Sequence, residues 1–214
     1  SLQDFRTDIE GLAARSENKT ETQLDQCRNA VKQTTGDVQK AETLVAQLTQ
    51  TVARLEAEIA KMTKQLEQVQ RRLPQIGNEV QSISSQLTQL RSRLSQLQAQ
   101  LSGADGEARE QIQAQINSVQ GQIHQCEQKK AQLEKEKSQL ETQKSQLQSG
   151  LSSAKGEKAK SEAELARQKN RRDKLKDKLA RLKTAFHRVE DKARDYVKAA
   201  RTFENRAGAS TQKS

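Results

Sequence analysis

Apolar residues recur at alternating gaps of three and four through most of the first half of this sequence. The series contains no polar residue and runs through Val38, Ala41, Val45, Leu48, Val52, Leu55, Ile59, Met62, Leu66, Val69, Leu73, Ile76, Val80, Ile83, Leu87, Leu90, Leu94, Leu97 and Leu101. This spacing is the a/d pattern of a left-handed coiled coil, sustained here for about nine heptads. It predicts a long helix that buries a narrow apolar stripe, the seam, against a second helix.

Helix-breaking residues near this series do not shift its phase. The same phase holds across Gly36, Pro74 and Gly77, and upstream it includes Leu24, Cys27, Val31 and Thr34. Proline removes one backbone hydrogen bond and crowds the preceding turn, so we expect Pro74 to kink a helix that continues. A short series offset by one residue predicts a looser or separate helix over roughly the first 20 residues. Its members are Leu2, Phe5, Ile9 and Leu12.

A stop signal nearly bisects the chain, and a second seam follows it. Two glycines flank small polar residues in the predicted turn, which comprises Ser102, Gly103, Ala104, Asp105 and Gly106. The second seam mixes apolar and polar residues and runs through Ile112, Ile116, Val119, Ile123, Cys126, Lys130, Leu133, Lys137, Leu140, Lys144, Leu147, Leu151, Ala154, Lys158, Ser161, Leu165, Gln168, Arg172, Leu175, Leu179, Leu182, Phe186, Val189, Ala193, Tyr196, Ala200 and Phe203. We therefore predict one coiled-coil domain over 1–206, with a first arm 2–101, a turn 102–106, a second arm 107–206 and a flexible tail 207–214.

Charge in the second seam predicts that the two arms are antiparallel. Lys130, Lys137 and Lys144 occupy three successive a positions, so in a parallel dimer each would face its own copy at a cost. In a tight antiparallel hairpin Lys130 would lie opposite Ile76 and Lys144 opposite Met62. A lysine can lay its methylenes over an apolar neighbour and keep its ammonium at the edge. The predicted fold is therefore all-α, a long antiparallel coiled-coil hairpin.

A compact bundle of four to six shorter helices is the alternative, if the chain reverses at its glycines and proline. Hydrophobic residues make up only 32% of the chain and aromatic residues 2%. A helix inside a bundle needs a wider apolar stripe than a and d positions supply. Composition therefore favours the hairpin.

The sequence offers little for catalysis or cofactor binding. His124 and Cys126 lie close in sequence but diverge on a helix, and a structural zinc site needs four ligands. Two cysteines are too few for a disulfide framework, and in a hairpin Cys27 and Cys126 would lie too far apart to bridge. No nucleophile elbow or phosphate-binding glycine loop is present. We expect no metal, no cofactor, no small-molecule substrate and no enzymatic activity.

Positive charge is the second notable feature, with a net charge of +10. It concentrates on a basic face spanning 167–206, whose candidate polyanion-binding residues are Arg167, Lys169, Arg171, Arg172, Lys174, Lys176, Lys178, Arg181 and Lys183. Such residues attract nucleic acid or anionic membrane non-specifically. Interleaved acidic residues and the lack of stacking aromatics favour instead a solvated helix face with local ion pairs.

These features favour a structural or interaction protein, a rigid spacer or docking arm for protein partners that attach at the turn and the termini, with self-association open to it. The alternatives are a polyanion-binding helical domain and the helical carrier region of a larger secreted protein. Segments such as Ser85-Gln86-Leu87-Thr88-Gln89-Leu90 and Lys144-Ser145-Gln146-Leu147 resemble coiled-coil arms in general, including hairpin arms of chromosome-organising ATPases, cytoskeletal rods and toxin helical domains. No secretory signal or membrane span is visible, which favours a cytoplasmic location.

Overall fold

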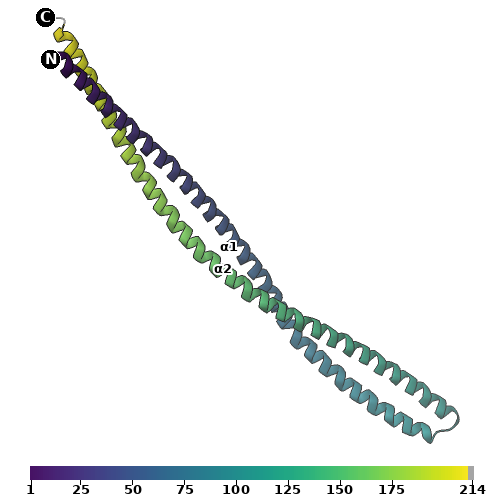
Figure 1. Ribbon diagram of the computed structural model, residues 1–214. Helices are drawn as coiled ribbons and strands as arrows, with labels where there is room; N and C mark the ends of the chain where they lie inside the picture. The colour runs from purple at the N-terminus through teal and green to yellow at the C-terminus, as the bar shows by residue number, and fades with distance from the viewer. Residues whose placement is uncertain (212–214) are drawn as a thin grey trace. The chain divides into compact units, whose positions relative to one another are not determined.

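The computed structural model describes residues 1–211 and consists of two long α-helices (Figure 1). Helix α1 spans Leu2–Ser102 and helix α2 spans Gly106–Thr211, so residues 103–105 join them. The turn thus falls within the predicted 102–106, which confirms the hairpin. The second helix ends five residues later than 206, and residues 212–214 of the predicted tail lie outside the described residues.

The glycines and the proline do not interrupt either helix. Pro74 and Gly77 lie inside α1, and Gly150 and Gly156 lie inside α2. Pro74 is solvent-exposed, so its ring lies on the side of α1 that faces away from α2. The alternative bundle of four to six helices is wrong, because the described chain reverses once. The offset apolar series at the start also belongs to α1 rather than to a separate helix.

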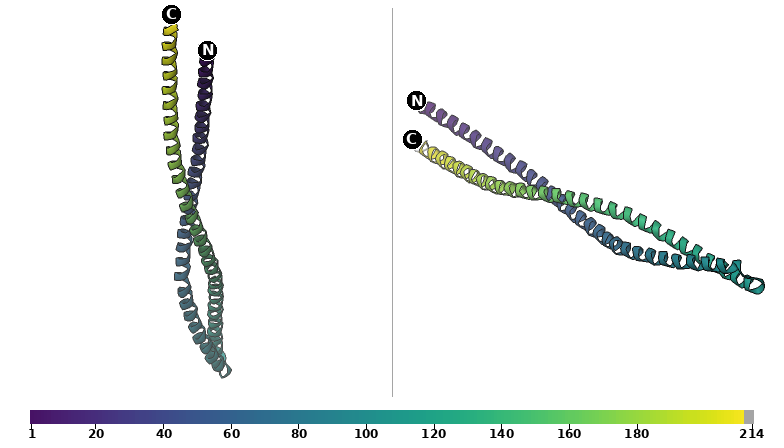
Figure 2. Two further views of the ribbon diagram at one scale, coloured as in Figure 1. Left: turned by 60° about the vertical axis from the view of Figure 1, so that its left-hand side comes forward. Right: turned by 90° about the horizontal axis from the view of Figure 1, so that it is seen from below.

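Contacts between the helices group into two packing units. The turn unit is Ala53–Ala159, and the terminal unit is Ser1–Val52 together with α2 from Lys160 onward. The division falls where the seam of α2 is polar, at Lys158 and Ser161. In each unit the two helices run antiparallel beside each other, and the terminal unit holds both ends of the chain (Figure 2). Whether 1–206 acts as one domain stays a prediction.

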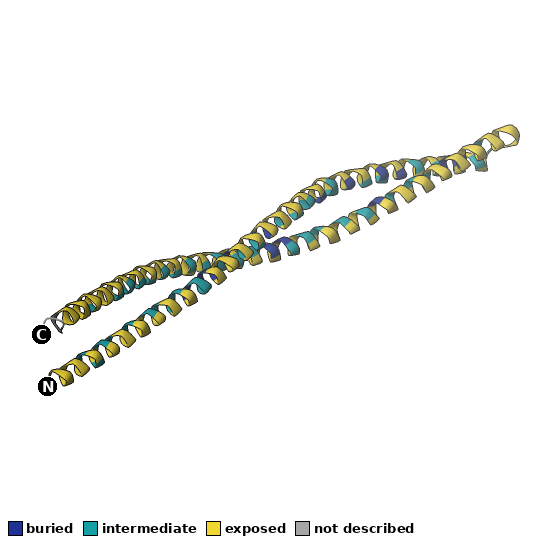
Figure 3. Ribbon diagram, turned by 90° about the horizontal axis from the view of Figure 1, so that it is seen from above, coloured by how far each residue is buried: buried dark blue, intermediate teal, exposed yellow. Residues whose placement is uncertain are grey.

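The predicted seam supplies the core of each unit. Every a/d residue of α1 from Val38 to Leu101 is buried or half-buried, while the positions between them are mostly exposed (Figure 3). One core cluster contains Ile76, Ile83, Leu87 and Leu133, with Ile76 fully enclosed. A second lies nearer the turn and contains Leu97, Ile116 and Val119. Apolar burial stabilises by about 25 cal/mol per Å². A narrow seam buries little area per turn of helix, so its total contribution grows with the length of the seam.

The register of the two helices differs from the one predicted. A Cβ on Gly150 would lie 3.0 Å from Met62 Sδ, so Met62 faces Gly150 rather than Lys144. Long helical side chains lean toward the N-terminus of their own helix. In α1 that direction leads away from the turn, so Met62 reaches a residue of α2 that is farther from the turn. Lys137, predicted in the seam, is exposed, while Lys130 and Lys144 are half-buried.

Within the terminal unit the seam is best closed in the part of α1 from Thr34 to Val45 and is more open toward the termini. Thr34, Val38, Ala41 and Val45 of α1 are buried. In α2 the facing leucines from 165 to 182 are half-buried. Tyr196 and Phe203 are 48% and 59% exposed, although the spacing of three and four continues to them. The prediction of a seam up to Phe203 is wrong for these two residues.

Candidate functional site

All nine predicted polyanion-binding residues lie on α2 in the terminal unit. Between residues 167 and 183 basic side chains outnumber acidic ones nine to two, which accounts for seven of the ten net positive charges of the chain. All nine are exposed except Arg172, which is half-buried in the seam. The segment is therefore a concentrated positive surface on one helix.

The structure divides these residues between two sides of α2. Heptad positions are labelled a to g, with a and d in the seam, so e and g positions flank the seam on opposite sides. Lys176, at an e position, places its Nζ 2.9 Å from Glu42 Oε1 of α1, and Glu42 is also at an e position. The e side of α2 therefore faces the e side of α1 and carries Lys169, Lys176 and Lys183.

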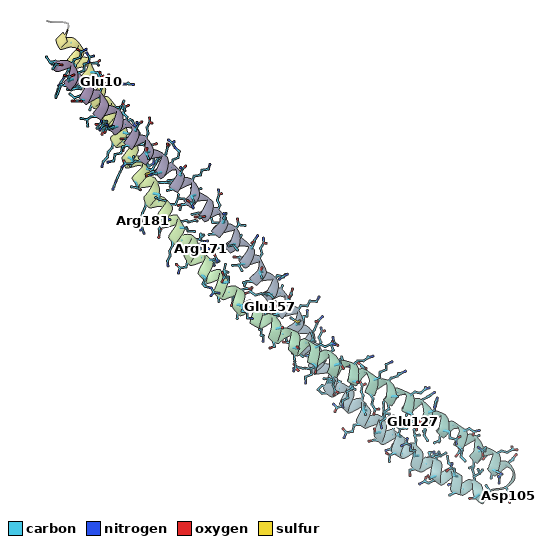
Figure 4. The ribbon with its side chains drawn as sticks, in the orientation of Figure 1. Glu10, Asp105, Glu127, Glu157, Arg171 and Arg181 are labelled. Atoms are coloured by element: carbon cyan, nitrogen blue, oxygen red, sulfur yellow. The ribbon has the colours of Figure 1, made fainter. Side chains whose placement is uncertain are left out.

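The c and g positions form the other side, which we call the basic stripe. Its cations follow one another at gaps of three and four, as neighbours on one helix face do. The basic stripe comprises Arg167, Arg171, Lys174, Lys178, Arg181, Arg188 and Lys192, and Ala185 occupies the one intervening position. Figure 4 labels two members, Arg171 and Arg181, on α2. Arg188 and Lys192 lie within the predicted basic face 167–206 but were not among the nine named residues, although the same gaps could have found them.

Few carboxylates neutralise the basic stripe. Arg167 Nη2 lies 2.8 Å from Glu164 Oε2. Within residues 1–211 the other six members have no carboxylate oxygen within 4.0 Å of their charged nitrogens. The pKa of Glu164 is lowered, first by a hydrogen bond from the side chain of Gln168 and then by Arg167.

Acidic residues close in sequence to the stripe pair elsewhere. Asp173 is 3.0 Å from Arg172, and Asp191 is 3.4 Å from Arg194. A shallow groove runs along the stripe, lined by Arg167, Asn170, Arg171, Lys174, Leu175 and Lys178. The stripe therefore presents a row of hydrated cations beside a shallow depression.

In the turn unit, by contrast, basic side chains pair across the two helices. Arg72 donates to both carboxylate oxygens of Glu136, at 2.9 and 3.1 Å, and also contacts Glu79 at 3.2 Å. The hydrogen bonds from Arg72 lower the pKa of Glu136, and those to Glu136 and Glu79 raise the pKa of Arg72. Arg91 pairs with Glu127 at 3.0 Å. The Arg72 pair is half-buried and the Arg91 pair is exposed, so each adds little stability, but they fix which side chains face each other.

The predicted turn is short and held by local hydrogen bonds. Gly103 N donates to Gln100 O, and Ala104 N donates to Leu101 O, both at 3.3 Å. Ser102 Oγ donates to Ala99 O at 2.9 Å. Gly106 has φ of +61°, a left-handed conformation that glycine adopts without the strain of a Cβ. Asp105 is exposed at the tip (Figure 4).

Groups that could bind a metal are dispersed. Among residues 1–211 no three His, Cys, Asp or Glu side chains come together in a way that could hold an ion. His124 is exposed, while the half-buried Cys126 lies 3.9 Å from Gln86 Oε1 through its thiol. Cys27 and Cys126 are both free thiols. Neither helix, over its described length, has a stretch apolar and long enough to cross a membrane.

Large apolar side chains near the termini are exposed, which the sequence pattern did not predict. We call this set of side chains the terminal apolar surface, and it comprises Leu2, Phe5, Leu12, Tyr196, Val197 and Phe203. Leu2 is 90% exposed and Phe5 64%. A groove in the same unit lies between Leu24 of α1 and α2 residues from Glu190 to Asn205. Sequence spacing could not reveal this exposure, because it does not say where the helices stop packing closely.

Two antiparallel helices joined by one tight turn, with an apolar seam between them, define an antiparallel coiled-coil hairpin. The chain is similar in structure to a coiled-coil segment of Smc from Pyrococcus yayanosii, with a TM-score of 0.52 and 14% identity over 97% of this chain and 93% of that one. It also matches a middle fragment of the Bacillus subtilis Smc coiled coil, with a TM-score of 0.47 and 14% identity over 97% and 99%. No protein-family model and no curated protein match the sequence. At this identity, the likeness to the Pyrococcus segment shows a shared fold alone.

Proposed function

We propose that the protein is a structural coiled-coil arm, a spacer that keeps its turn and its paired termini at a set distance. The observation that supports this proposal is the seam, in which every a/d position of α1 from Val38 to Leu101 is covered by the other helix. Helices this long gain most of their stability from such packing rather than from helix propensity. Two helices packed along their length in this way resist bending more than either helix alone.

The lengths of the helices set the scale of the spacer. Helix α1 has 101 residues and α2 has 106. At 1.5 Å per residue, a straight helix of that length extends about 150 Å. In this role the chain separates the partners that bind at its two ends. It does so through charged and apolar surface contacts rather than through catalysis.

Docking at the termini is the second part of the proposal. Large apolar side chains near both termini are exposed, and exposed apolar surface is a common mark of protein–protein contact. The a/d spacing continues through Tyr196 and Phe203, so a partner helix would extend the same seam. We therefore propose that partner proteins dock on the terminal apolar surface by helix packing.

Small-angle X-ray scattering of the purified chain tests the spacer, because it returns both mass and maximum dimension. A particle of 24.0 kDa with a maximum dimension near 150 Å is the expected result. A monomer of about 60–80 Å, roughly half that helix length, would contradict the proposal. A particle of twice the mass and nearly twice the length would support docking between the terminal apolar surfaces of two copies.

A further inference from the structure

We propose that the basic stripe binds the phosphate backbone of duplex nucleic acid, an activity separate from spacing and docking. The proposal rests on the arrangement of the seven cations rather than on the net charge of the chain. Seven of the eight consecutive c and g positions from Arg167 to Lys192 are basic and none is acidic. An ordinary solvated helix face carries both signs in alternation.

The dimensions of the stripe suit a duplex. Residues 167 and 192 are 25 positions apart on one continuous helix, which is about 37 Å at 1.5 Å per residue. One turn of B-form DNA rises about 34–36 Å. A straight row of cations of this length spans about one helical turn and can meet the phosphate backbones where they cross its line. The contacts would be with phosphate alone, so we expect no sequence preference.

The cations of the stripe are available to phosphate. Six of the seven have no carboxylate oxygen within 4.0 Å among residues 1–211, and the side chains are exposed. Binding a phosphate therefore breaks almost no ion pair. Each phosphate neutralised also releases condensed counterions from the duplex, which is the main source of non-specific affinity.

Helix α1 does not cancel this charge. Because the e sides face each other at Lys176 and Glu42, the g side of α2 faces the g side of α1. One carboxylate, Asp37, lies among the c and g positions there, and Lys40 offsets it. From 23 to 47 these α1 positions are Gln23, Gln26, Ala30, Gln33, Asp37, Lys40, Leu44 and Gln47. The positive stripe therefore borders a nearly neutral strip.

The arrangement of the basic stripe disfavours two other ligands, an anionic lipid surface and single-stranded nucleic acid. A membrane-surface helix inserts a wide apolar face, but the leucines beside the stripe, such as Leu175, are half-buried in the seam. Proteins that bind single strands stack bases on aromatic side chains. No stripe position is aromatic, since the c and g residues are Arg, Lys and Ala. What remains is a linear cationic surface suited to the regular phosphates of a duplex.

Fluorescence anisotropy with a labelled DNA duplex of about three helical turns tests the proposal on the full chain. The stripe variant carries R171Q, K174Q and K178Q. The control variant removes the same charge from the opposite side, with K169Q, K176Q and K183Q. Glutamine is a good helix former, and circular dichroism checks that both variants keep the helicity of the unaltered chain.

The unaltered chain should bind the duplex at 50 mM salt and lose most of its affinity by 200 mM, as phosphate contacts do. In the stripe variant we expect the slope of log affinity against log salt to fall by about 2 to 3, and affinity near 0.1 M salt to fall on the order of 100-fold. The control variant should stay within about fivefold of the unaltered chain, since its charges act only at a distance. Equal losses in both variants would overturn the stripe as the site.

Further outcomes would show that the chain prefers a polyanion other than duplex nucleic acid. No duplex binding at 50 mM salt, or tighter binding to a single strand of the same length, would overturn the proposal. So would sedimentation with phosphatidylserine-containing vesicles that a competing duplex fails to displace. Because none of these readouts depends on particle length, the scattering experiment can fail while this one succeeds, and the reverse.

Discussion

Replacing Gly150 with alanine should leave stability almost unchanged, whereas the same change at Gly156 should stabilise the hairpin. Both glycines lie inside α2 in the turn unit. Alanine is more favourable than glycine in a helix interior by about 0.8–1.0 kcal/mol. A Cβ at Gly156 would meet nothing within 4 Å, so Gly156→Ala should gain that full amount.

At Gly150 the new methyl group would lie 3.0 Å from Met62 Sδ. Non-bonded carbon atoms in good contact are about 3.5–4.0 Å apart. The new methyl group would be closer than that to the sulfur, so Met62 must move. Pushing a side chain well off its rotamer costs about 0.5–1.5 kcal/mol, which offsets the helical gain. We therefore expect Gly150→Ala to change the free energy of unfolding by less than about 0.5 kcal/mol.

Urea unfolding followed by far-ultraviolet circular dichroism measures both changes, and a double-mutant cycle isolates the contact. In a Met62→Ala background the obstruction is gone, so Gly150→Ala should recover its gain of about 1 kcal/mol. If Gly150→Ala and Gly156→Ala stabilise equally, and Met62→Ala leaves both unchanged, the two helices do not have the register described above.

Three further predictions concern the core, the turn and the ion pairs. Ile76→Ala should destabilise by about 3–4 kcal/mol in urea unfolding, because three carbons leave a fully buried site and a cavity remains. Gly106→Ala should cost about 1–2 kcal/mol because φ is +61° there, whereas Gly103→Ala, whose φ is not positive, should be nearly neutral. The pKa of Glu136 is lowered in the folded state, so its contribution is present above the ordinary value of 4.5 and lost as pH falls through and below it. The urea midpoint of Glu136→Gln should therefore fall less between about pH 7 and pH 3 than that of the control Glu134→Gln.

The sequence predicted the fold to the level of single seam positions, because heptad spacing states directly which residues of a helix face its partner. It did so across Pro74 and at the polar positions Lys130, Lys144 and Lys158 of the second arm, although Lys137 is exposed. The turn was predicted to within a residue, since Gly103 and Gly106 supply the only close pair of helix breakers near the middle. These are properties of local spacing and backbone chemistry.

Register and exposure at the ends could not be predicted in the same way. The choice of Gly150 rather than Lys144 as the neighbour of Met62 depends on the lean of side chains in three dimensions. The exposure of Phe203 depends on where close packing stops, which a spacing that continues unchanged does not record. For the candidate site, sequence located the basic segment but treated it as one face, whereas the ion pair of Lys176 separates two sides.

The polar residues in the seam of α2 show why the two arms differ in composition. Lys158 occupies an a position, yet its Nζ lies 3.2 Å from Glu56 Oε1, at an e position of α1. Its stem follows the seam while its ammonium leaves at the edge, as proposed for lysines at such positions. If two copies of α2 paired in parallel instead, Lys130, Lys144 and Lys158 would each meet an identical lysine across the seam. The apolar arm α1 accepts these lysines, so the charge placed in α2 favours pairing of the two different arms over pairing of α2 with its own copy.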